Sequence, residues 1–374
     1  MRIAYFTESL PPQTDGVAKT LSRLMETLEA SGIDFRFYSP FKPGTAFKWS
    51  ERVRKVLSLP IFLYSEYRLA VPFLHPLTWE LDRYKPDLVH VASPSLLGLF
   101  GLSYARRRHV KAVSSYHTHF ISYLPYYGLK KAEDAGWKFL KWFHNQFHRT
   151  YAPSRSAAGE LTQRGIKGVE KWPRGVECDK FSPAFRNDEL RRECGAGERP
   201  ILLFVGRLVK EKDLDDLVDA DRILAHAGHE YKIVIVGDGP MRPELETAMP
   251  DAFFTGYQHG HRLSEWYASS DIFVFPSTTE TFGNVILEAY SSGVPAVGVN
   301  KGGVTDIINH DVDGFLAKPN NPRHFADHVG ILLKDPKRRR DMSSSARETA
   351  RRFSWENVNG ALIQSYRNLL VSNN

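Results

Sequence analysis

The residues with the clearest capacity for chemistry lie in one stretch, FVFPSTTETFGNVILEAYSSGVPAVGV at positions 273–299. Seven residues separate Glu280 from Glu288, with Gly283 between them at a predicted helix start. Backbone N–H groups at a helix start lack intrahelical partners and bind anions such as a diphosphate, and a glycine lets the ligand approach. One carboxylate can then face hydroxyls beyond the diphosphate, and the other can face hydroxyls on its opposite side. The pattern suits a sugar nucleotide; the alternative is a helix cap at Glu280 and a solvated Glu288.

Three further groups of residues follow predicted strands in the same half of the chain. Arg207 and Lys212 lie in GRLVKEK, where two cations can neutralise a diphosphate, Arg with a forked geometry and Lys as a compact charge. The glycines of GDGP at 237–240 permit close backbone approach, and Tyr257 could pack on a base. Each of these groups has an ordinary alternative interpretation, as a solvated face or as a turn. Because all three follow successive strands of one domain, together they indicate a diphosphate site.

The elements that must position these residues form two βα series. Apolar strands are predicted at 1–8, 35–38, 87–91, 112–116 and 151–154, and again at 201–205, 232–236, 252–255, 272–275 and 296–299. Gly16 lies at the entrance of a helix predicted over 17–29, and His117 follows the strand at 112–116. Strand, glycine-containing loop and helix begin a doubly wound α/β domain. The fingerprint G-x-G-x-x-G is missing from the first loop, which argues against a nicotinamide enzyme.

Length and charge indicate two domains with different partners. A chain of 374 residues is too long for one ordinary core. We therefore predict domains at 1–172 and 173–354, and a terminal helix at 355–371. The first 172 residues carry a net charge of +11 and the remainder −4, which favours an anionic surface as partner of the N-terminal domain. No nucleic-acid-reading module is recognisable, so we expect a membrane surface and no nucleic acid; the alternative is a merely soluble basic surface.

Two segments of the basic half have a composition typical of a lipid interface. Basic residues alternate with aromatic and aliphatic ones over 40–71, and Trp137–Tyr151 has aromatic residues at near-helical spacing opposite Lys138, Lys141, His144 and Arg149. Packing on the core is the alternative for both, and the more favoured one for the second. The chain lacks a run of eighteen apolar residues and a signal-peptide pattern, and its two cysteines form no metal or disulfide pattern. We therefore expect a cytoplasmic protein, peripheral on the inner face of the cytoplasmic membrane.

The order of these motifs resembles the family 4 retaining glycosyltransferases of GT-B fold along nearly the whole chain, including their E-x7-E motif at Glu280 and Glu288. DGVAKT, KPDLVHVASPSLLG, SYHTHFISYLPYYGL, FVGRLVKEK, VGDGP and PSTTETFGNVILEAYSSGVPAVG are similar to a subgroup of that family. This subgroup holds sulfoquinovosyldiacylglycerol synthases and GDP-mannose-dependent glycolipid mannosyltransferases. The sequence departs from many members at Asp15, and at Thr305 and Asp306, where Pro-Glu is common.

The resemblance implies a role for each matching residue. The expected catalytic residues are His117 facing the transferred sugar, Arg207 and Lys212 on the diphosphate, and Glu280 on sugar hydroxyls, with Glu288 on the ribose. It also implies that the C-terminal helix returns to the N-terminal domain. The expected donor-binding residues are Gly16, Val17, Gly206, Arg207, Lys212, Gly237, Tyr257, Glu280, Thr281, Phe282, Gly283, Asn284, Val285 and Glu288.

The expected reaction is transfer of an α-hexosyl group from a nucleotide diphosphate sugar to a membrane lipid or glycolipid. GDP-mannose is the favoured donor, and the alternative is a UDP-linked glucosyl, glucuronosyl or sulfoquinovosyl donor. The alternative acceptors are a polysaccharide, a lipopolysaccharide or a soluble molecule. The alternative to an enzyme is a sugar-nucleotide-binding protein without activity. We expect no cofactor and no required metal. The D-x-D pairs at 213/215 and 219/221 fall in a predicted helix and the pair at 311/313 in a turn, and cations with a helix N-terminus can supply a metal's electrostatic effect.

Overall fold

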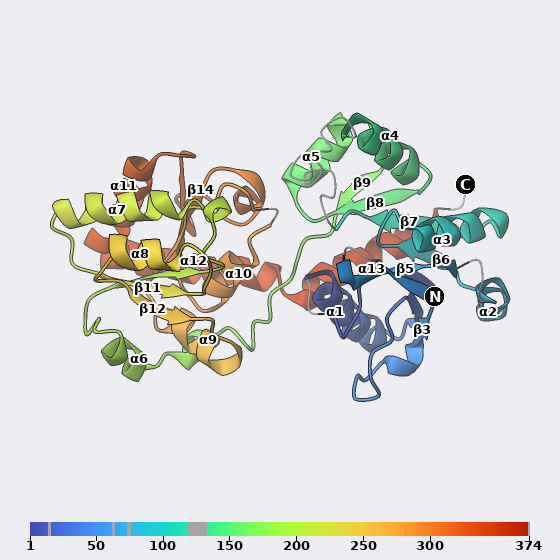
Figure 1. Ribbon diagram of the computed structural model, residues 1–374, viewed down its shortest axis with the longest axis horizontal. Coiled ribbons are helices and arrows are strands. Elements are labelled where there is room, and N and C mark those ends of the chain that lie inside the picture. The colour runs from blue at the N-terminus through green and yellow to red at the C-terminus, as the bar shows by residue number, and fades with distance from the viewer. Residues whose placement is uncertain (14–15, 62–63, 73–75, 118–132, 281, 373–374) are drawn as a thin grey trace. The chain divides into compact units, whose positions relative to one another are not determined.

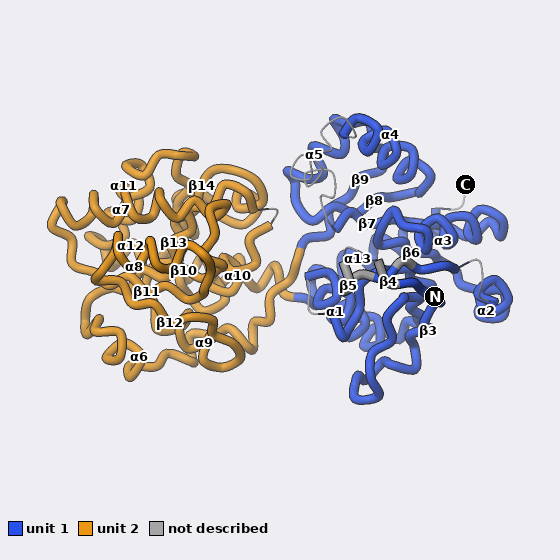
Figure 2. The backbone as a smooth tube through the Cα atoms, in the orientation of Figure 1, with its two compact units in different colours: residues 1–173, 355–374 blue, residues 174–354 orange. Residues whose placement is uncertain are grey.

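The chain folds into two compact units. The computed structural model describes residues 1–13, 16–61, 64–72, 76–117, 133–280 and 282–372. Unit 1 comprises residues 1–173 with 355–374, and unit 2 comprises residues 174–354 (Figure 2). None of the described helices is both long and apolar enough to cross a membrane.

Unit 1 is built on a parallel sheet. In its described part seven strands follow the order β3-β2-β1-β6-β7-β8-β9, and a separate antiparallel pair joins β4 and β5. The apolar runs in β1 and β6 are buried, as expected for strands covered on both faces. The strands are β1 (Arg2–Phe6), β2 (Asp34–Ser39), β3 (Val53–Lys55), β4 (Ser58–Ile61), β5 (Tyr64–Ala70), β6 (Leu88–Val91), β7 (Lys111–Ser115), β8 (Arg149–Ala152) and β9 (Val169–Lys171). The helices are α1 (Gly16–Ala30), α2 (Leu77–Tyr84), α3 (Leu96–Arg107), α4 (Glu133–His144), α5 (Arg155–Gln163) and α13 (Trp355–Val371), with a 3-10 turn η1 (Ser50–Arg52).

The C-terminal helix α13 is part of unit 1, where it packs beside α1 (Figure 1). Its Tyr366 Oη lies 2.5 Å from Nδ1 of the fully buried His90 in β6. The other ring nitrogen of His90 contacts the hydroxyls of Ser115 and Tyr5. Burial holds the pKa of His90 well below its usual value, so the imidazole is neutral and can both donate and accept. Helix α13 is therefore attached by polar contacts inside the core as well as by apolar packing.

Unit 2 repeats the doubly wound plan with a parallel sheet. Six strands are ordered β12-β11-β10-β13-β14-β15 among its described residues, and the order reverses between β10 and β13. Its strands are β10 (Ile201–Val205), β11 (Lys232–Val236), β12 (Phe253–Gly256), β13 (Ile272–Phe275), β14 (Ala296–Val299) and β15 (Gly314–Ala317). The helices are α6 (Asp188–Glu193), α7 (Leu214–His226), α8 (Arg242–Ala248), α9 (Gly260–Ala268), α10 (Asn284–Ser291), α11 (Pro322–Lys334) and α12 (Pro336–Arg352), with 3-10 turns η5 (Pro183–Phe185), η6 (Lys210–Lys212) and η7 (Gly302–Asp306). Ligands of open α/β sheets bind outside the carboxyl ends of strands at such a reversal, which here involves the loops after β10 and β13.

Some predicted elements were wrong. The helix predicted up to Tyr151 ends at His144, and β8 begins at Arg149. His144, expected on a wet face, is fully buried and contacts Ser114 Oγ at 2.9 Å, because α4 packs its Trp137, Leu140 and Phe143 side on the sheet. Strands β3, β4, β5, β9 and β15 were not predicted. Strands β4 and β5 lie inside the segment 40–71, which was interpreted as a connection, and β3 and β9 contain charged residues in a run of only three.

Candidate functional site

The loops after β10, β11 and β12 in unit 2 are joined by backbone hydrogen bonds. The N–H of Leu208 donates to the carbonyl of Asp238 at 2.9 Å, and the N–H of Gly237 donates to the carbonyl of Gly256 at 2.9 Å. Tyr257, 56% exposed, donates its hydroxyl to the same Asp238 carbonyl at 3.1 Å. The residues predicted from separate motifs are thus brought together at one sheet edge, with an aromatic ring on the surface beside them.

The glycines of the GDGP turn are required by packing within the protein. A Cβ on Gly237, whose φ is +145°, would lie 1.8 Å from the carbonyl oxygen of Gly206. A Cβ on Gly239 would lie 2.4 Å from the carbonyl oxygen of Leu208. The close approach predicted for these glycines is therefore made by the neighbouring loop of the chain itself. That contact fixes the position of the Gly206–Leu208 backbone.

Lys212 and Glu280 form an ion pair between the loops after β10 and β13. Their side chains are 18% and 19% exposed, so both charges are largely removed from water. The two loops are also joined directly, because the N–H of Thr278 donates to Asp213 Oδ2 at 2.7 Å and the Thr279 hydroxyl donates to the Glu211 carbonyl at 2.8 Å. The pair lies at the reversal of strand order. It places a cation and a carboxylate side by side where a phosphorylated sugar would need both.

Arg207 lies in the same loop as Lys212 but in a different environment. Its side chain is 67% exposed and lies 3.7 Å from the carboxylate of Glu211. Water and salt screen an exposed charge far more than a buried one. The two predicted cations therefore lie in one loop, but Lys212 is largely shielded from water and Arg207 is exposed.

The start of helix α10 has the left-handed backbone that a glycine allows. Gly283 precedes the helix with φ +96°, and Asn284 behind it is exposed. Phe282 is buried and meets Phe353 edge-on, with ring centroids 5.9 Å apart. Val285 is half-buried, and Thr281 lies outside the described residues. The turn at Gly283 and the helix start at Asn284 are therefore held in place by the packed Phe282 ring next to them.

Glu288 is oriented by a residue that no motif in the sequence indicated. Tyr267 in α9 donates its hydroxyl to Glu288 Oε2 at 2.9 Å. Tyr267 is fully buried, and burial with the neighbouring carboxylate raises its pKa well above the usual value, so it stays a donor. The two residues are 21 positions apart in sequence, and their pairing follows from the packing of α9 against α10.

The predicted residues of unit 1 lie at the carboxyl ends of its strands. Gly16 is the first residue of α1, is exposed and has open space around its Cβ position; Val17 follows it half-buried. His117 is two residues beyond β7 and meets the ring of Trp172 edge-on at 5.2 Å. Because the sheet is parallel, the loop before α1 and the loop after β7 meet the same edge. Thr118 and His119 of the SYHTH motif, and Asp15, lie outside the described residues.

The aspartates of the first two D-x-D pairs lie in or just before helix α7, and Asp313 of the third pair is a buried hydrogen-bond acceptor. Asp215, Asp219 and Asp221 are in α7 and Asp213 precedes it. Asp313 is fully buried and accepts hydrogen bonds from Tyr290, Thr349 and the N–H of Asn309 at 2.7–2.8 Å. Within the described ranges no three His, Cys, Asp or Glu side chains gather as metal ligands would.

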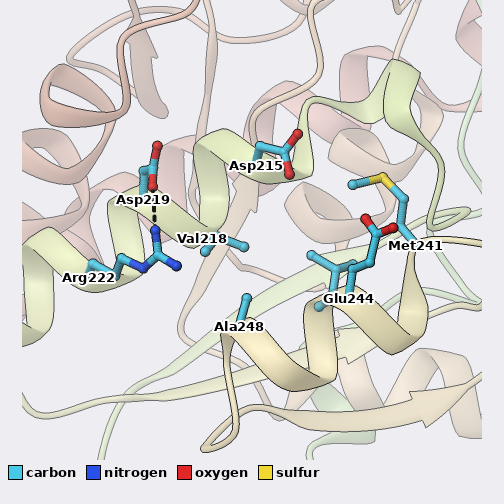
Figure 3. A pocket seen from close by; sticks show the side chains of 8 residues that line it. Asp215, Val218, Asp219, Arg222, Met241, Glu244 and Ala248 are labelled. Atoms are coloured by element: carbon cyan, nitrogen blue, oxygen red, sulfur yellow. Dashed lines mark hydrogen bonds and ion pairs between the residues drawn. The ribbon is translucent and has the colours of Figure 1, made fainter.

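A groove of about 180 Å³ lies between α7 and α8 (Figure 3). Asp215, Asp219 and Glu244 give it an acidic rim, and Arg222 pairs with Asp219 at 3.0 Å across its α7 side. Val218, Leu245 and Ala248 line its apolar part. It contains none of the predicted donor-binding residues.

Comparison with known proteins identifies both halves of the chain. The model of the group 1 glycosyl transferases matches residues 186–349, and that of glycosyltransferase family 4 matches residues 14–180. A GDP-mannose-dependent alpha-mannosyltransferase of Mycobacterium tuberculosis is 35% identical over 98% of this chain and 96% of its own length. A sulfoquinovosyl transferase of Arabidopsis thaliana is 32% identical over 95% of this chain and 71% of its own. The crystal structure of Anabaena HepE with UDP, 20% identical, superposes over 98% of this chain and all of that one with a TM-score of 0.75, which shows the same fold.

Proposed function

This chain belongs to the family 4 glycosyltransferases of GT-B fold, and we propose that it transfers an α-hexosyl group from a nucleotide diphosphate sugar to a hydroxyl of a membrane lipid or glycolipid, with retention of configuration. The mycobacterial mannosyltransferase supports GDP-mannose as the donor. A UDP-linked glucosyl, glucuronosyl or sulfoquinovosyl donor is the second candidate, supported by the sulfoquinovosyl transferase. The observation that carries the proposal is the Lys212–Glu280 pair at the ends of β10 and β13.

The proposed reaction exchanges one bond at the anomeric carbon for another. The bond to the donor's phosphate oxygen breaks, a bond to the acceptor oxygen forms on the same face, and the acceptor's proton passes to the leaving diphosphate. The diphosphate gains negative charge during this step, so a nearby cation stabilises the transition state more than the bound donor. Lys212 is the stronger source of this effect, because its charge is 18% exposed whereas that of Arg207 is 67% exposed.

Glu280 and Glu288 are proposed to bind donor hydroxyls. A diphosphate competes with Glu280 for Lys212, which leaves the Glu280 carboxylate to accept hydrogen bonds from the transferred sugar. Tyr267 keeps the Glu288 carboxylate oriented toward the ribose. Gly16 and His117 of unit 1 are proposed to serve the donor phosphates and the transferred sugar as the family resemblance implies. No divalent cation is required in this scheme, because Lys212, Arg207 and the start of α10 supply positive potential.

Replacement of Lys212 by Ala tests the proposal. We expect this variant to lower kcat by about 10²- to 10³-fold with GDP-mannose or with UDP-hexoses. Lys210→Ala is the matched control, because Lys210 lies in the same 3-10 turn with an exposed side chain. Thermal-shift titration with GDP and UDP first identifies the base that stabilises the folded protein. Turnover of Lys212→Ala equal to that of Lys210→Ala, or no stabilisation by either nucleotide, would contradict the assignment of the donor site.

We also propose that unit 1 docks on an anionic membrane through helix α4. Phe139 and Trp142 are 39% and 49% exposed on α4, with ring centroids 5.9 Å apart. The exposed side chains of Lys138 and Lys141 flank them. An aromatic pair beside lysines suits the interface of an anionic bilayer, where rings enter the headgroup region and cations stay near phosphates. This supports a peripheral position on the inner face of the cytoplasmic membrane.

Flotation with vesicles tests this surface. The double variant Phe139→Ser with Trp142→Ser is expected to lose binding to vesicles containing about 30% phosphatidylglycerol, and the wild-type protein to be released by salt. The matched control is Trp79→Ser, because Trp79 is 64% exposed on α2 of the same unit. Equal binding by the double variant and the wild type would refute the docking surface, as would an equal loss with Trp79→Ser.

A further inference from the structure

Two partly buried side chains, whose polar atoms are shielded from solvent, follow neighbouring strands at the carboxyl edge of the unit 1 sheet. Phe6 of β1 is in register with Val91 of β6, and the N–H of Ala92 donates to the Phe6 carbonyl at 2.8 Å. Glu8 and Ser93 each lie two residues beyond these register partners, so they leave the sheet side by side. They lie at the edge where ligands of open α/β sheets bind.

The polar atoms of Glu8 and Ser93 are shielded from water and unpaired among the residues that the structure describes. Both carboxyl oxygens of Glu8 and the hydroxyl of Ser93 are inaccessible to solvent, and none meets hydrogen-bond geometry with a described residue. The Ser95 hydroxyl lies near enough to favour the ionised carboxylate, but burial has the larger effect. No charged group among the described residues contributes to the pKa of Glu8. Leaving such groups unpaired lowers the free energy of unfolding. A residue with a purely structural role would not be expected to carry this cost.

Two other shielded carboxylates, the fully buried Asp313 and the 20% exposed Asp271, show what a structural position looks like. Asp313 accepts bonds from three donors, as described above, and Asp271 accepts from Arg191 at 2.8 Å and from the N–H of Ile201 at 2.8 Å. In the part of the chain that the structure describes, Glu8 has no such set of donors. Its environment is that of a carboxylate whose partner arrives with a ligand.

The loop that carries Ser93 is held firmly. A Cβ on Gly98 would lie 2.1 Å from the Ser93 carbonyl oxygen, so helix α3 starts directly against this loop. Ser95 caps the same helix, its hydroxyl accepting from the N–H of Gly98 at 3.1 Å. Ser93 is therefore placed by the fold before any ligand binds.

We propose that Glu8 and Ser93 form a binding site for two neighbouring hydroxyl groups of the acceptor. Glycerol and a sugar ring both present such a diol. The Glu8 carboxylate accepts a hydrogen bond from one hydroxyl, and Ser93 bonds the next. This assignment rests on the proposed transfer to a hydroxyl acceptor and adds to it the residues of unit 1 that select the acceptor. Glu8 is a binding and positioning residue here, since the acceptor's proton passes to the leaving diphosphate.

The ionisation of Glu8 gives the site a pH dependence. Burial raises the pKa of Glu8 from its ordinary 4.5 to about 7, against the smaller opposing effect of the Ser95 hydroxyl. The carboxyl group can accept bonds with both oxygens only when ionised. The acceptor should therefore bind more tightly as the pH rises from 6 to 8, and that dependence should vanish when Glu8 is replaced by Gln.

Steady-state kinetics of Glu8→Gln on the full chain tests the assignment with two acceptor probes. Dioleoylglycerol in mixed micelles presents glycerol hydroxyls, and octyl α-glucoside presents sugar hydroxyls. We expect Glu8→Gln to raise the acceptor KM at pH 8 by about tenfold or more, the effect of losing a hydrogen bond to a charged group. Ser93→Ala is expected to raise it less. Glu51→Gln is the matched control, because its side chain is 86% exposed in unit 1.

Donor readouts separate acceptor binding from general damage. Hydrolysis of the donor without acceptor, and the thermal shift with GDP or UDP, should stay within about twofold of the wild type in Glu8→Gln. A normal acceptor KM with an unchanged pH profile would overturn the assignment, and so would loss of hydrolysis in proportion to transfer. If the wild type transfers to neither probe, the proposed function fails and the assignment fails with it. The probe whose KM rises identifies the hydroxyl source, glycerol or sugar.

Discussion

Replacement of Glu8 by Gln should change how the stability of unit 1 depends on pH. Glu8 has a folded-state pKa of about 7, raised by burial above its ordinary 4.5. Between these values the folded state holds a proton that the unfolded state has released, so the unfolding free energy falls as the pH rises. The whole difference corresponds to about 3 kcal/mol, present below pH 4.5 and lost as the pH rises through 7. About 2.5 kcal/mol of it falls between pH 5 and pH 8.

Urea unfolding at pH 5 and pH 8 measures this difference. Six of the seven tryptophans lie in unit 1, so fluorescence reports its transition. The wild type should lose about 2.5 kcal/mol relative to Glu8→Gln on going from pH 5 to pH 8, because a neutral amide does not titrate. Comparing the two proteins at each pH cancels every other titrating group. Equal pH dependence of Glu8→Gln, the wild type and the exposed control Glu51→Gln would refute the reasoning.

Three further perturbations have defined outcomes. Gly237→Ala, whose Cβ would lie 1.8 Å from the Gly206 carbonyl, should destabilise unit 2 by about 3 kcal/mol or more in urea unfolding, whereas Gly228→Ala, with open space at φ +73°, should cost about 1 kcal/mol. His328, whose pKa is lowered to about 4 by burial and by His324 and His310 against the opposing Asp327 and Asp311, contributes stability above pH 6.5 that is lost as the pH falls. Because solvent screens this partly exposed ring, His328→Gln should lose about 1 kcal/mol less unfolding free energy than the wild type between pH 7 and pH 4.5. Tyr366→Phe removes the hydroxyl 2.5 Å from His90 and should lower the unfolding free energy of unit 1 by about 1–3 kcal/mol, with unchanged activity per folded molecule.

The parallel strands of unit 2 were predictable because each is a short apolar run between polar turns. The predicted bounds of β10, β11, β13 and β14 agree with the structure, and β12 differs by one residue. Strands buried on both faces must be apolar throughout, which gives a strong local signal. Strand β15 gave a weaker signal, because GFLA begins with a glycine and carries only three apolar side chains. The structure requires that glycine, since a Cβ there would lie 2.3 Å from the Ala296 carbonyl oxygen.

The segments predicted to lie at a lipid interface show where local pattern is insufficient. Trp49, Val53 and Val56 are buried, and Lys48 and Arg52 pair with Glu29 and Asp34 of α1 and β2. The basic and aromatic residues over 40–71 therefore serve largely to pack this connection on its own unit. In α4 the exposed aromatic residues are Phe139 and Trp142, which lie off the predicted apolar stripe. The apolar stripe identifies the helix face that packs on the core. Which aromatic residues of the neighbouring face stay exposed is known only from the fold.

The partners of the site residues could not be predicted, since they join distant segments. Lys212 and Glu280 are 68 positions apart, and their pairing depends on the strand order β10-β13. Tyr267 reaches Glu288 only because α9 packs against α10. The sequence indicates which residue types stand at strand ends. Which of them meet is decided by the order of strands in the sheet, which no local pattern contains.

Burial has opposite consequences for the two carboxylates proposed to bind substrate hydroxyls. Glu280, 19% exposed, lies beside Lys212, so the two charges offset each other's partial loss of water, and removing either leaves the other uncompensated. The carboxylate oxygens of Glu8 are shielded from water with no cation beside them among the described residues, so its charge costs stability that a neutral side chain would restore. Variants at the two positions should therefore differ in sign: Glu280→Gln should lower the unfolding free energy of unit 2, and Glu8→Gln should raise that of unit 1 at pH 8. A carboxylate that lowers stability while lying at a ligand-binding edge is retained for what it binds.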